Sequence, residues 1–118
     1  MIGATTHKIP EIWMYRVPVD FRKQSNGLIQ VVIDELKRQA NDGAMYVFRN
    51  RGKDKVKILM WDRNGFVLTY KRLEKGRFDF PKKEEGHVVI TQEQYEMLIS
   101  GMPVLHYGRD AEQKIQYE

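Results

Sequence analysis

Apolar residues recur along the chain with two different periods, and the changes of period mark the expected elements. Residues 11–17 (EIWMYRV) are rich in β-branched and aromatic side chains, and Pro18 follows them, which predicts a strand. Ser25 or Asn26 can cap a helix that runs to about Ala40. Its buried stripe is expected to step by four residues, through Leu28, Val32, Leu36 and Ala40.

Further apolar segments predict strands that follow this helix. Residues 44–49, 55–62 and 66–73 are expected to form an antiparallel meander, because turn residues separate them. Residues 77–80 are a candidate for a short fourth strand that ends at a proline, and residues 87–90 predict another short strand. The fold class expected from this order is α+β, with an antiparallel sheet of about four to five strands and two helices.

The turn between the second and third strands of the meander fits two registers. Asn-Gly is a strong hairpin signal. A two-residue loop at Asn64-Gly65 places Lys57 opposite Arg72, whereas a three-residue loop with Gly65 left-handed places Lys57 opposite Lys71. We prefer the second, and both make Lys57 face another cation, which costs stability unless an anion binds there. The apolar face of the preferred register would contain Val56, Ile58, Met60, Leu68 and Tyr70.

The second helix has clear signals at both ends. Thr91 and Gln94 form the pattern of a capping box, and Gly101 followed by Pro103 predicts the end. The core side of this helix is expected to contain Tyr95, Leu98, Ile99 and Met102. We expect one domain over residues 1–102 and a flexible tail over residues 103–118, with Tyr107 as the tail residue most suited to docking.

Charge along the chain is segregated. Residues 49–83 contain twelve of the twenty Lys and Arg residues and only four acids, so this segment carries +8 while the remainder carries −4. A concentrated positive field favours a polyanionic partner, because each neutralised phosphate releases condensed counterions. The competing interpretation is an ordinary sheet whose solvated faces use Lys and Arg freely.

Composition excludes several classes of function. The chain has no cysteine, which excludes disulfides, thiolate zinc sites and cysteine nucleophiles. No apolar run approaches the roughly 20 residues of a membrane span, and residues 1–10 lack the apolar core of a secretory signal. We therefore expect a soluble intracellular protein.

Catalytic patterns are sparse. Neither a phosphate-binding GxxxxGK[ST] loop nor a GxSxG motif occurs, and the three histidines have no metal-ligand spacing. Asp20 with Glu35 and Lys37 distantly resembles the carboxylate and lysine sets of metal-dependent nucleases. However, Glu35 and Lys37 lie on the outer face of the predicted helix, where solvated charges are ordinary. We expect no catalytic residue, no metal and no cofactor. The histidines are His7, His87 and His106.

Aromatic residues are interleaved with the cations and have two interpretations. They are able to stack on bases of a single strand, or they form the core face of the strands. The core is favoured for Phe66 and Tyr70. Trp61 points to the face of Lys57 and Lys71 in the preferred register, so base stacking and protein contact both stay open for it. The aromatic set is Trp61, Phe66, Tyr70, Phe78 and Phe80.

Several motifs together resemble one known family. The chain is similar to the TnpB (second-reading-frame) accessory proteins of bacterial insertion-sequence family sixty-six, over about residues 10–102. The WD-x-x-G block at 61–65 and the YKRLE-x-G block at 70–76 carry most of the specificity. Supporting matches are Asp20-Phe21-Arg22-Lys23, Gly27-Leu28, Phe48-Arg49-Asn50-Arg51, Asp54-Lys55-Val56-Lys57 and Thr91-Gln92-Glu93-Gln94.

The resemblance implies a role in transposition beside a separate transposase, in the bacterial cytoplasm or at the nucleoid, and it supplies no catalytic residue. We expect a non-catalytic accessory that binds DNA, including insertion-sequence ends. The alternative is a protein-interaction module that recruits or regulates the transposase without binding DNA. The residues expected to contact phosphates are Arg49, Arg51, Lys53, Lys55, Lys57, Lys71, Arg72, Lys75 and Arg77, with Trp61 as a stacking or partner contact.

Overall fold

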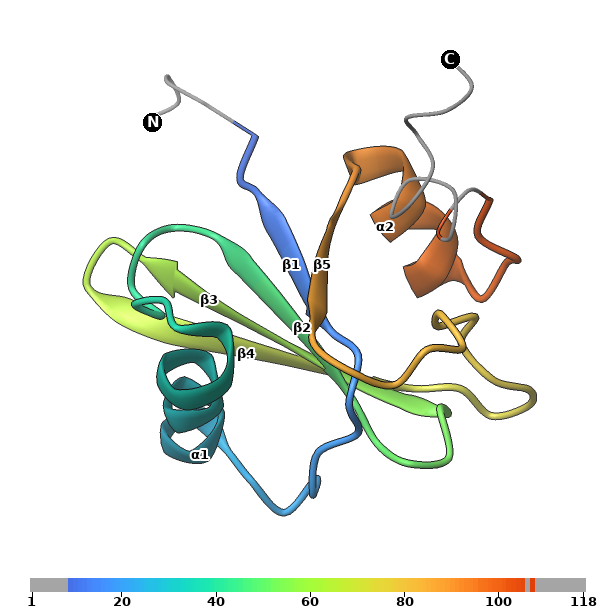
Figure 1. Ribbon diagram of the computed structural model, residues 1–118, viewed down its shortest axis with the longest axis horizontal. Helices are drawn as coiled ribbons and strands as arrows, with labels where there is room; N and C mark the ends of the chain where they lie inside the picture. The colour runs from blue at the N-terminus through green and yellow to red at the C-terminus, as the bar shows by residue number, and fades with distance from the viewer. Residues whose placement is uncertain (1–8, 106, 108–118) are drawn as a thin grey trace.

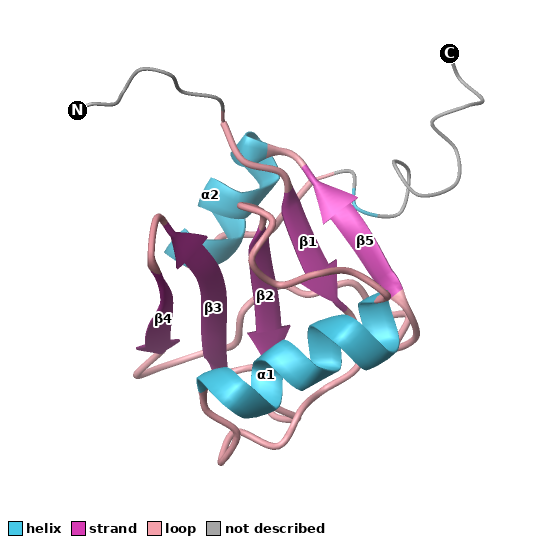
Figure 2. Ribbon diagram, turned by 90° about the vertical axis from the view of Figure 1, so that its left-hand side faces the viewer, coloured by secondary structure: helices cyan, strands magenta, loops and turns pink. Residues whose placement is uncertain are grey.

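A mixed sheet runs through the part of the chain that the computed structural model describes, which is residues 9–105 and 107. Within these residues the sheet has five strands in the order β4-β3-β2-β1-β5. Helix α1 lies on one face of the sheet and helix α2 on the other (Figures 1 and 2). The elements are β1 (Ile12–Tyr15), α1 (Ser25–Val31) continued by a π-helical turn η2 (Val32–Leu36), β2 (Met45–Arg49), β3 (Lys55–Asp62), β4 (Gly65–Arg72), β5 (His87–Ile90) and α2 (Gln92–Ser100).

The predicted meander is confirmed as β2, β3 and β4, which pair antiparallel. The sheet also contains one parallel pair that the sequence did not predict, since β1 runs parallel to β2 with Ile12 beside Met45. Helix α1 makes the crossover between them, as a parallel pair requires. Strand β5 adds to the other edge of β1 in antiparallel fashion, with Ile90 beside Ile12. The prediction of an α+β domain with an antiparallel sheet of about four to five strands is therefore confirmed, with the difference that the sheet is mixed and only mostly antiparallel.

Both predicted registers of the β3–β4 hairpin are wrong. The two-residue loop is Arg63-Asn64, where Arg63 takes the left-handed conformation at φ 54° instead of Gly65. Trp61 consequently pairs with Phe66, and their rings meet edge to face at 5.0 Å. Lys57 lies opposite Tyr70 and not opposite a cation, so the repulsion that pointed to an anion at Lys57 does not exist.

The change of register also changes which residues share a face. Successive side chains of a strand point to opposite sides, so a shift of one residue moves every partner across the sheet. Leu68 and Tyr70 lie on the α1 side together with Leu59, while Val56 and Ile58 face α2. The predicted single apolar face is therefore divided between two cores.

Helix α1 has its N-cap one residue before the first expected cap, and the helix ends sooner than its apolar stripe. Gln24 is the N-cap and makes no side-chain cap bond, so the assignment of the cap to Ser25 or Asn26 is wrong. The helix ends because Lys37 adopts the left-handed conformation at φ 60°. Ala40 is still buried, but a turn rather than a helix carries it into the core.

A hydrogen-bonded cluster holds this turn where a helix was predicted. Arg38 donates to Tyr46 Oη at 2.9 Å and to Asp42 Oδ2 at 2.7 Å, and the Tyr46 hydroxyl donates to the same oxygen at 2.8 Å. Burial raises the pKa of Tyr46 to about 12, which keeps its proton available for Asp42. The cluster replaces the last predicted turn of the helix with side-chain bonds that join the loop to β2.

Each face of the sheet buries its own core. The α1 side packs around residues such as Leu28, Val32 and Phe48, and the α2 side around residues such as Met14, Val47 and Leu98. The α2 capping box is confirmed, because the Thr91 side chain accepts from the Gln94 backbone and the Gln94 side chain accepts in return.

Residues 77–80 are described and do not form the predicted strand, but their aromatic side chains pack into the core. Phe78 and Phe80 are buried in the α2-side core, so neither ring is available for base stacking. Asp79 accepts a hydrogen bond from the backbone of Val104 at 2.7 Å. The chain directly after α2 is thus docked, with Val104 buried and Tyr107 packed against the same core. The rest of the predicted tail lies outside the described residues.

Candidate nucleic-acid interface

Two loops meet at one end of the sheet and bring the predicted cations together. Residues 50–54 connect β2 to β3, and residues 73–78 follow β4. Antiparallel pairing places the start of β3 beside the end of β4, with Lys55 opposite Arg72. The Leu73 backbone N–H then donates to the Asp54 carbonyl at 2.9 Å. These loops are the green and yellow segments toward the lower right of Figure 1.

Internal hydrogen bonds organise the first of these loops. The Asn50 side chain donates to Asp54 Oδ1 at 2.7 Å and accepts from the Lys55 backbone at 3.0 Å. Lys53 takes the left-handed conformation at φ 63°, and its carbonyl accepts from Phe78 at 2.7 Å. The hydrogen bond from Asn50, followed by the nearby Lys55, lowers the pKa of Asp54, so this acid stays ionised within a cationic loop.

Six of the nine predicted phosphate contacts lie on or beside these two loops, and we call them the cationic end. Only Asp54 and Glu74 offset their charge within residues 51–55 and 72–77. Both acids pair weakly with members of the group, Asp54 with Lys55 at 3.6 Å and Glu74 with Arg72 at 3.3 Å. Exposed or half-buried side chains of the cationic end are Arg51, Lys53, Lys55, Arg72, Lys75 and Arg77.

Arg49, the first predicted phosphate contact, is completely buried at 0% exposure. Its guanidinium donates to Glu84 Oε2 at 2.9 Å, to the Arg16 carbonyl at 3.1 Å and to the Asn50 carbonyl at 3.1 Å. It therefore joins the ends of β1 and β2 to the loop that precedes β5. This side chain does not reach the surface in the folded protein.

Two more predicted contacts donate to backbone carbonyls. Lys57 is 5% exposed, and its ammonium binds the carbonyls of Phe21 at 2.9 Å and Lys23 at 2.7 Å. Burial lowers the pKa of Lys57. Lys71 donates to the Ile99 carbonyl at 2.6 Å, in the last turn of α2, where helix carbonyls lack partners within the helix. Like Arg49, both cations fasten parts of the fold together.

Trp61 lies away from the cationic end. It precedes the Arg63-Asn64 turn, at the opposite end of the hairpin from Lys55. Its ring is half-buried against Phe66. Tyr70, which was expected in the core, is instead 51% exposed on the α1 side of β4.

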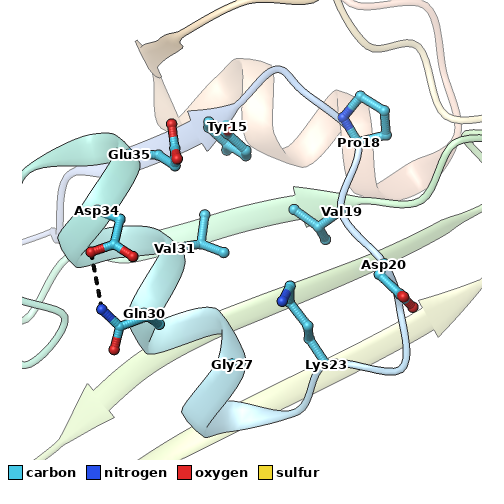
Figure 3. Close-up of a pocket in the computed structure, with 10 residues that line it drawn as sticks. All are labelled: Tyr15, Pro18, Val19, Asp20, Lys23, Gly27, Gln30, Val31, Asp34 and Glu35. Atoms are coloured by element: carbon cyan, nitrogen blue, oxygen red, sulfur yellow. Dashed lines mark hydrogen bonds between the residues drawn. The ribbon is translucent and has the colours of Figure 1, made fainter.

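An acidic depression lies beside α1 (Figure 3). The residues that line it show whether the nuclease-like set of Asp20, Glu35 and Lys37 comes together. Asp20 and Glu35 both line it, but Figure 3 shows their carboxylates at opposite ends of the depression. Arg22 holds Asp20 in a two-pronged ion pair with a shortest distance of 2.6 Å. Lys37 is not among the lining residues, and the described part of the chain contains no group of three metal-ligating side chains. The side chains of Asp20, Glu35 and Lys37 are therefore not brought together as a nuclease site requires.

Sequence reasoning missed the segment that covers Lys57. Residues 20–24 lie against the β3–β4 hairpin, where Phe21 contacts Tyr70. Its Asp-Phe-Arg-Lys motif was visible as part of the family resemblance, but no local signal tied it to the hairpin.

Among the described residues, no helix is long and apolar enough to cross a membrane.

Comparison with known proteins agrees with the architecture and the motifs. The chain belongs to the family described as IS66 Orf2 like protein, which matches residues 10–109. This family implies an accessory role in transposition. The resemblance drawn from the motifs is thereby confirmed.

Two relatives come from Sinorhizobium fredii (strain NBRC 101917 / NGR234), and both are described as uncharacterized. The protein y4jC is 35% identical over 85 residues, which cover 72% of this chain and 73% of the relative. The protein y4hO is 34% identical over 95 residues, which cover 80% of this chain and 83% of the relative. No solved structure matches the chain.

Proposed function

We propose that this protein is a non-catalytic transposition accessory that binds DNA through the cationic end. The observation that carries the proposal is the convergence of six cations on two loops whose backbones bond to each other. These backbone hydrogen bonds hold the two loops together before binding. A polyanion that meets them releases counterions without paying for much ordering of the protein.

The proposed contact is with the DNA backbone and not with base edges in a groove. Helices α1 and α2 are short, and the outward residues of η2 and α2 include acids such as Asp34 and Glu96. An acidic helix face is repelled by phosphates, so neither helix suits the major groove. Phosphate contacts position a protein on DNA but carry no sequence information. We therefore expect similar affinities for different duplex sequences.

A salt series tests this proposal. The purified protein is titrated into two fluorescent duplexes, one with the terminal inverted repeat of the element and one with a scrambled sequence. If about four phosphates are neutralised, log K falls with log salt at a slope near −3.6. Equal slopes and equal affinities are expected for both duplexes. Absence of binding at low salt would overturn the proposal.

A matched pair of variants locates the contact. Lys75→Gln with Arg77→Gln removes two charges from the cationic end, and the slope should flatten by about 1.8. Lys37→Gln with Arg63→Gln removes the same charge from two exposed sites, one directly after η2 and one in the β3–β4 turn. The second variant should bind like the wild type. Equal loss in both variants would mean a diffuse charge effect rather than an interface.

A second candidate is a module that binds the transposase, and an exposed sheet edge favours it. Strand β4 is an edge strand with Val67 and Tyr70 about half exposed, and such edges accept a strand from a partner. A complex with an acidic protein surface also weakens with salt, so salt dependence does not separate the candidates. Direct titration with the purified transposase does. Binding to the transposase together with no binding to either duplex would favour this candidate.

A further inference from the structure

A depression beside the cationic end combines aromatic and cationic side chains. It lies on the α1 side of the β3–β4 hairpin, between the hairpin and residues 20–24, with a volume of about 590 Å³. This falls within the roughly 300–1,000 Å³ of small-ligand sites. The side chains that matter for its chemistry are Phe21, Arg22, Lys55, Leu68 and Tyr70.

The Lys57 ammonium packs against both aromatic rings of this depression. The centroids of Phe21 and Tyr70 are 6.2 Å apart, with the ring planes at 58°. The Lys57 ammonium lies 4.9 Å from the Phe21 centroid and 5.8 Å from the Tyr70 centroid. Because two backbone carbonyls fix that ammonium, the rings rest on a rigid support. Tyr70 is half exposed, so part of this supported ring is open to a ligand.

Cations flank the rings on the side toward the cationic end. Lys55 lines the depression, and Arg72 lies opposite Lys55 in the hairpin. Arg72 is two residues beyond Tyr70 on the same face of β4, which is a separation of about 7 Å along the strand. One acid, Asp20, also lines the depression, but its negative charge is offset by Arg22, which pairs with it at 2.6 Å.

We propose that this depression binds an unpaired nucleotide of a DNA strand, with the base stacked on Tyr70 and its phosphate at Lys55 and Arg72. The inference rests on the proposed DNA binding and adds a preference for single-stranded or locally opened DNA. A nucleotide matches the site because it joins a flat aromatic group to an anion. An aliphatic partner would cover the ring but offer no anion to either cation.

The test compares single-stranded and duplex DNA with two substitutions of Tyr70. The probes are a fluorescent oligothymidine strand of about 12 nucleotides and a duplex of similar length. Tyr70→Thr removes the ring but keeps a β-branched strand residue, and it should weaken binding to the single strand about five- to one-hundredfold. Binding of the duplex should stay within about twofold. Tyr70→Phe keeps the ring, so it should bind the single strand like the wild type.

An abasic strand and a control substitution separate stacking from charge. A strand with the same phosphates but no bases should bind the wild type and Tyr70→Thr equally. Val67→Thr, on the opposite face of β4, should leave binding to all probes unchanged. Equal loss for single strand and duplex in Tyr70→Thr, or no loss in either, would overturn the stacking site while duplex binding stands. If the wild type binds no DNA, the proposed function itself fails.

Discussion

The cations that bond to backbone carbonyls and the cations exposed on the loops have the same chemistry but opposite roles in this protein. Arg49, Lys57 and Lys71 donate to carbonyls and join elements that are distant along the chain. The cations of the loops, such as Lys75 and Arg77, are exposed. Both groups belong to the same basic segment of the sequence. A local excess of positive charge in a sequence therefore has two sources. Some of its cations bond elements of the fold to each other, and the others produce the positive field outside the protein.

This difference teaches that cations bonded to backbone carbonyls and solvated cations of a basic segment need separate treatment, even within one strand, because Lys55 and Lys57 both lie on β3. A long cation such as Lys57 or Lys71 reaches from its strand to backbone carbonyls of other elements, and each hydrogen bond to a charged group contributes about 1.5–3 kcal/mol. Among the described residues, the side chains of the cationic end donate to no backbone carbonyl, and they stay exposed or half-buried. The field available to a polyanion comes from the second kind, and the predictions below test this division.

The largest effect is expected from Arg49→Met. The substitution removes the donor to Glu84 and to two carbonyls at a fully buried position. We expect the free energy of unfolding to fall by about 3 kcal/mol, because buried groups lose their partner. Urea denaturation measures this change. Arg51→Met, at an exposed neighbouring loop position, should stay within about 0.5 kcal/mol of the wild type.

The same pair of variants sharpens the division when DNA binding is measured. Under conditions where both variants are folded, Arg51→Met should weaken duplex binding, and Arg49→Met should not. The reverse result, with Arg49→Met stable but weaker in binding, would show that the guanidinium leaves its internal partners to contact phosphate.

A smaller effect is expected from Lys57→Met. Two carbonyls, of Phe21 and Lys23, lose their donor, but the buried charge also disappears, and burial lowers the pKa of this lysine. These contributions oppose each other, so we expect a loss of about 1–2 kcal/mol in the free energy of unfolding. Lys55→Met is the control, since it is the neighbouring lysine on the same face of β3 and is less buried. A larger loss of unfolding free energy in Lys55→Met than in Lys57→Met would contradict the separation of internally bonded cations from solvated ones.

Local signals were enough to predict several elements of this fold. The capping box of Thr91 and Gln94 and the left-handed Gly101 define α2 at both ends. Alternation and turn residues defined the meander. These signals involve residues within a few positions of each other, so the sequence displays them directly.

The hairpin register and the roles of the individual cations depend on contacts between residues that are far apart in the sequence, so local patterns did not predict them. The hairpin register depends on packing of Leu59 and Leu68 in the α1-side core, which no feature of the Arg63-Asn64-Gly65 turn encodes. The role of Arg49 depends on Glu84, which is 35 positions away. The candidate interface was thus predicted as a segment, but its division into internal and external cations required the tertiary structure.

The smallest effect concerns a basic group that the fold keeps neutral. His87 packs against Trp13 with ring centroids 4.9 Å apart. Burial, and then the positive charges of Arg16 and Arg38, lower the pKa of His87 below its value of about 6.5 in the unfolded chain. As pH falls below about 6.5, the unfolded state therefore takes up the proton first, and the protein loses stability until the folded-state pKa is reached.

Substitution of His87→Gln should remove this part of the pH dependence. The free energy of unfolding is measured by urea denaturation between about pH 5 and pH 8, and the variant is subtracted from the wild type so that carboxylates cancel. The difference should decrease as the pH falls, by less than the effects of Arg49→Met and Lys57→Met. A difference that is constant with pH would mean that His87 titrates alike in both states, and that burial and the charges of Arg16 and Arg38 have no net effect on its pKa in the folded protein.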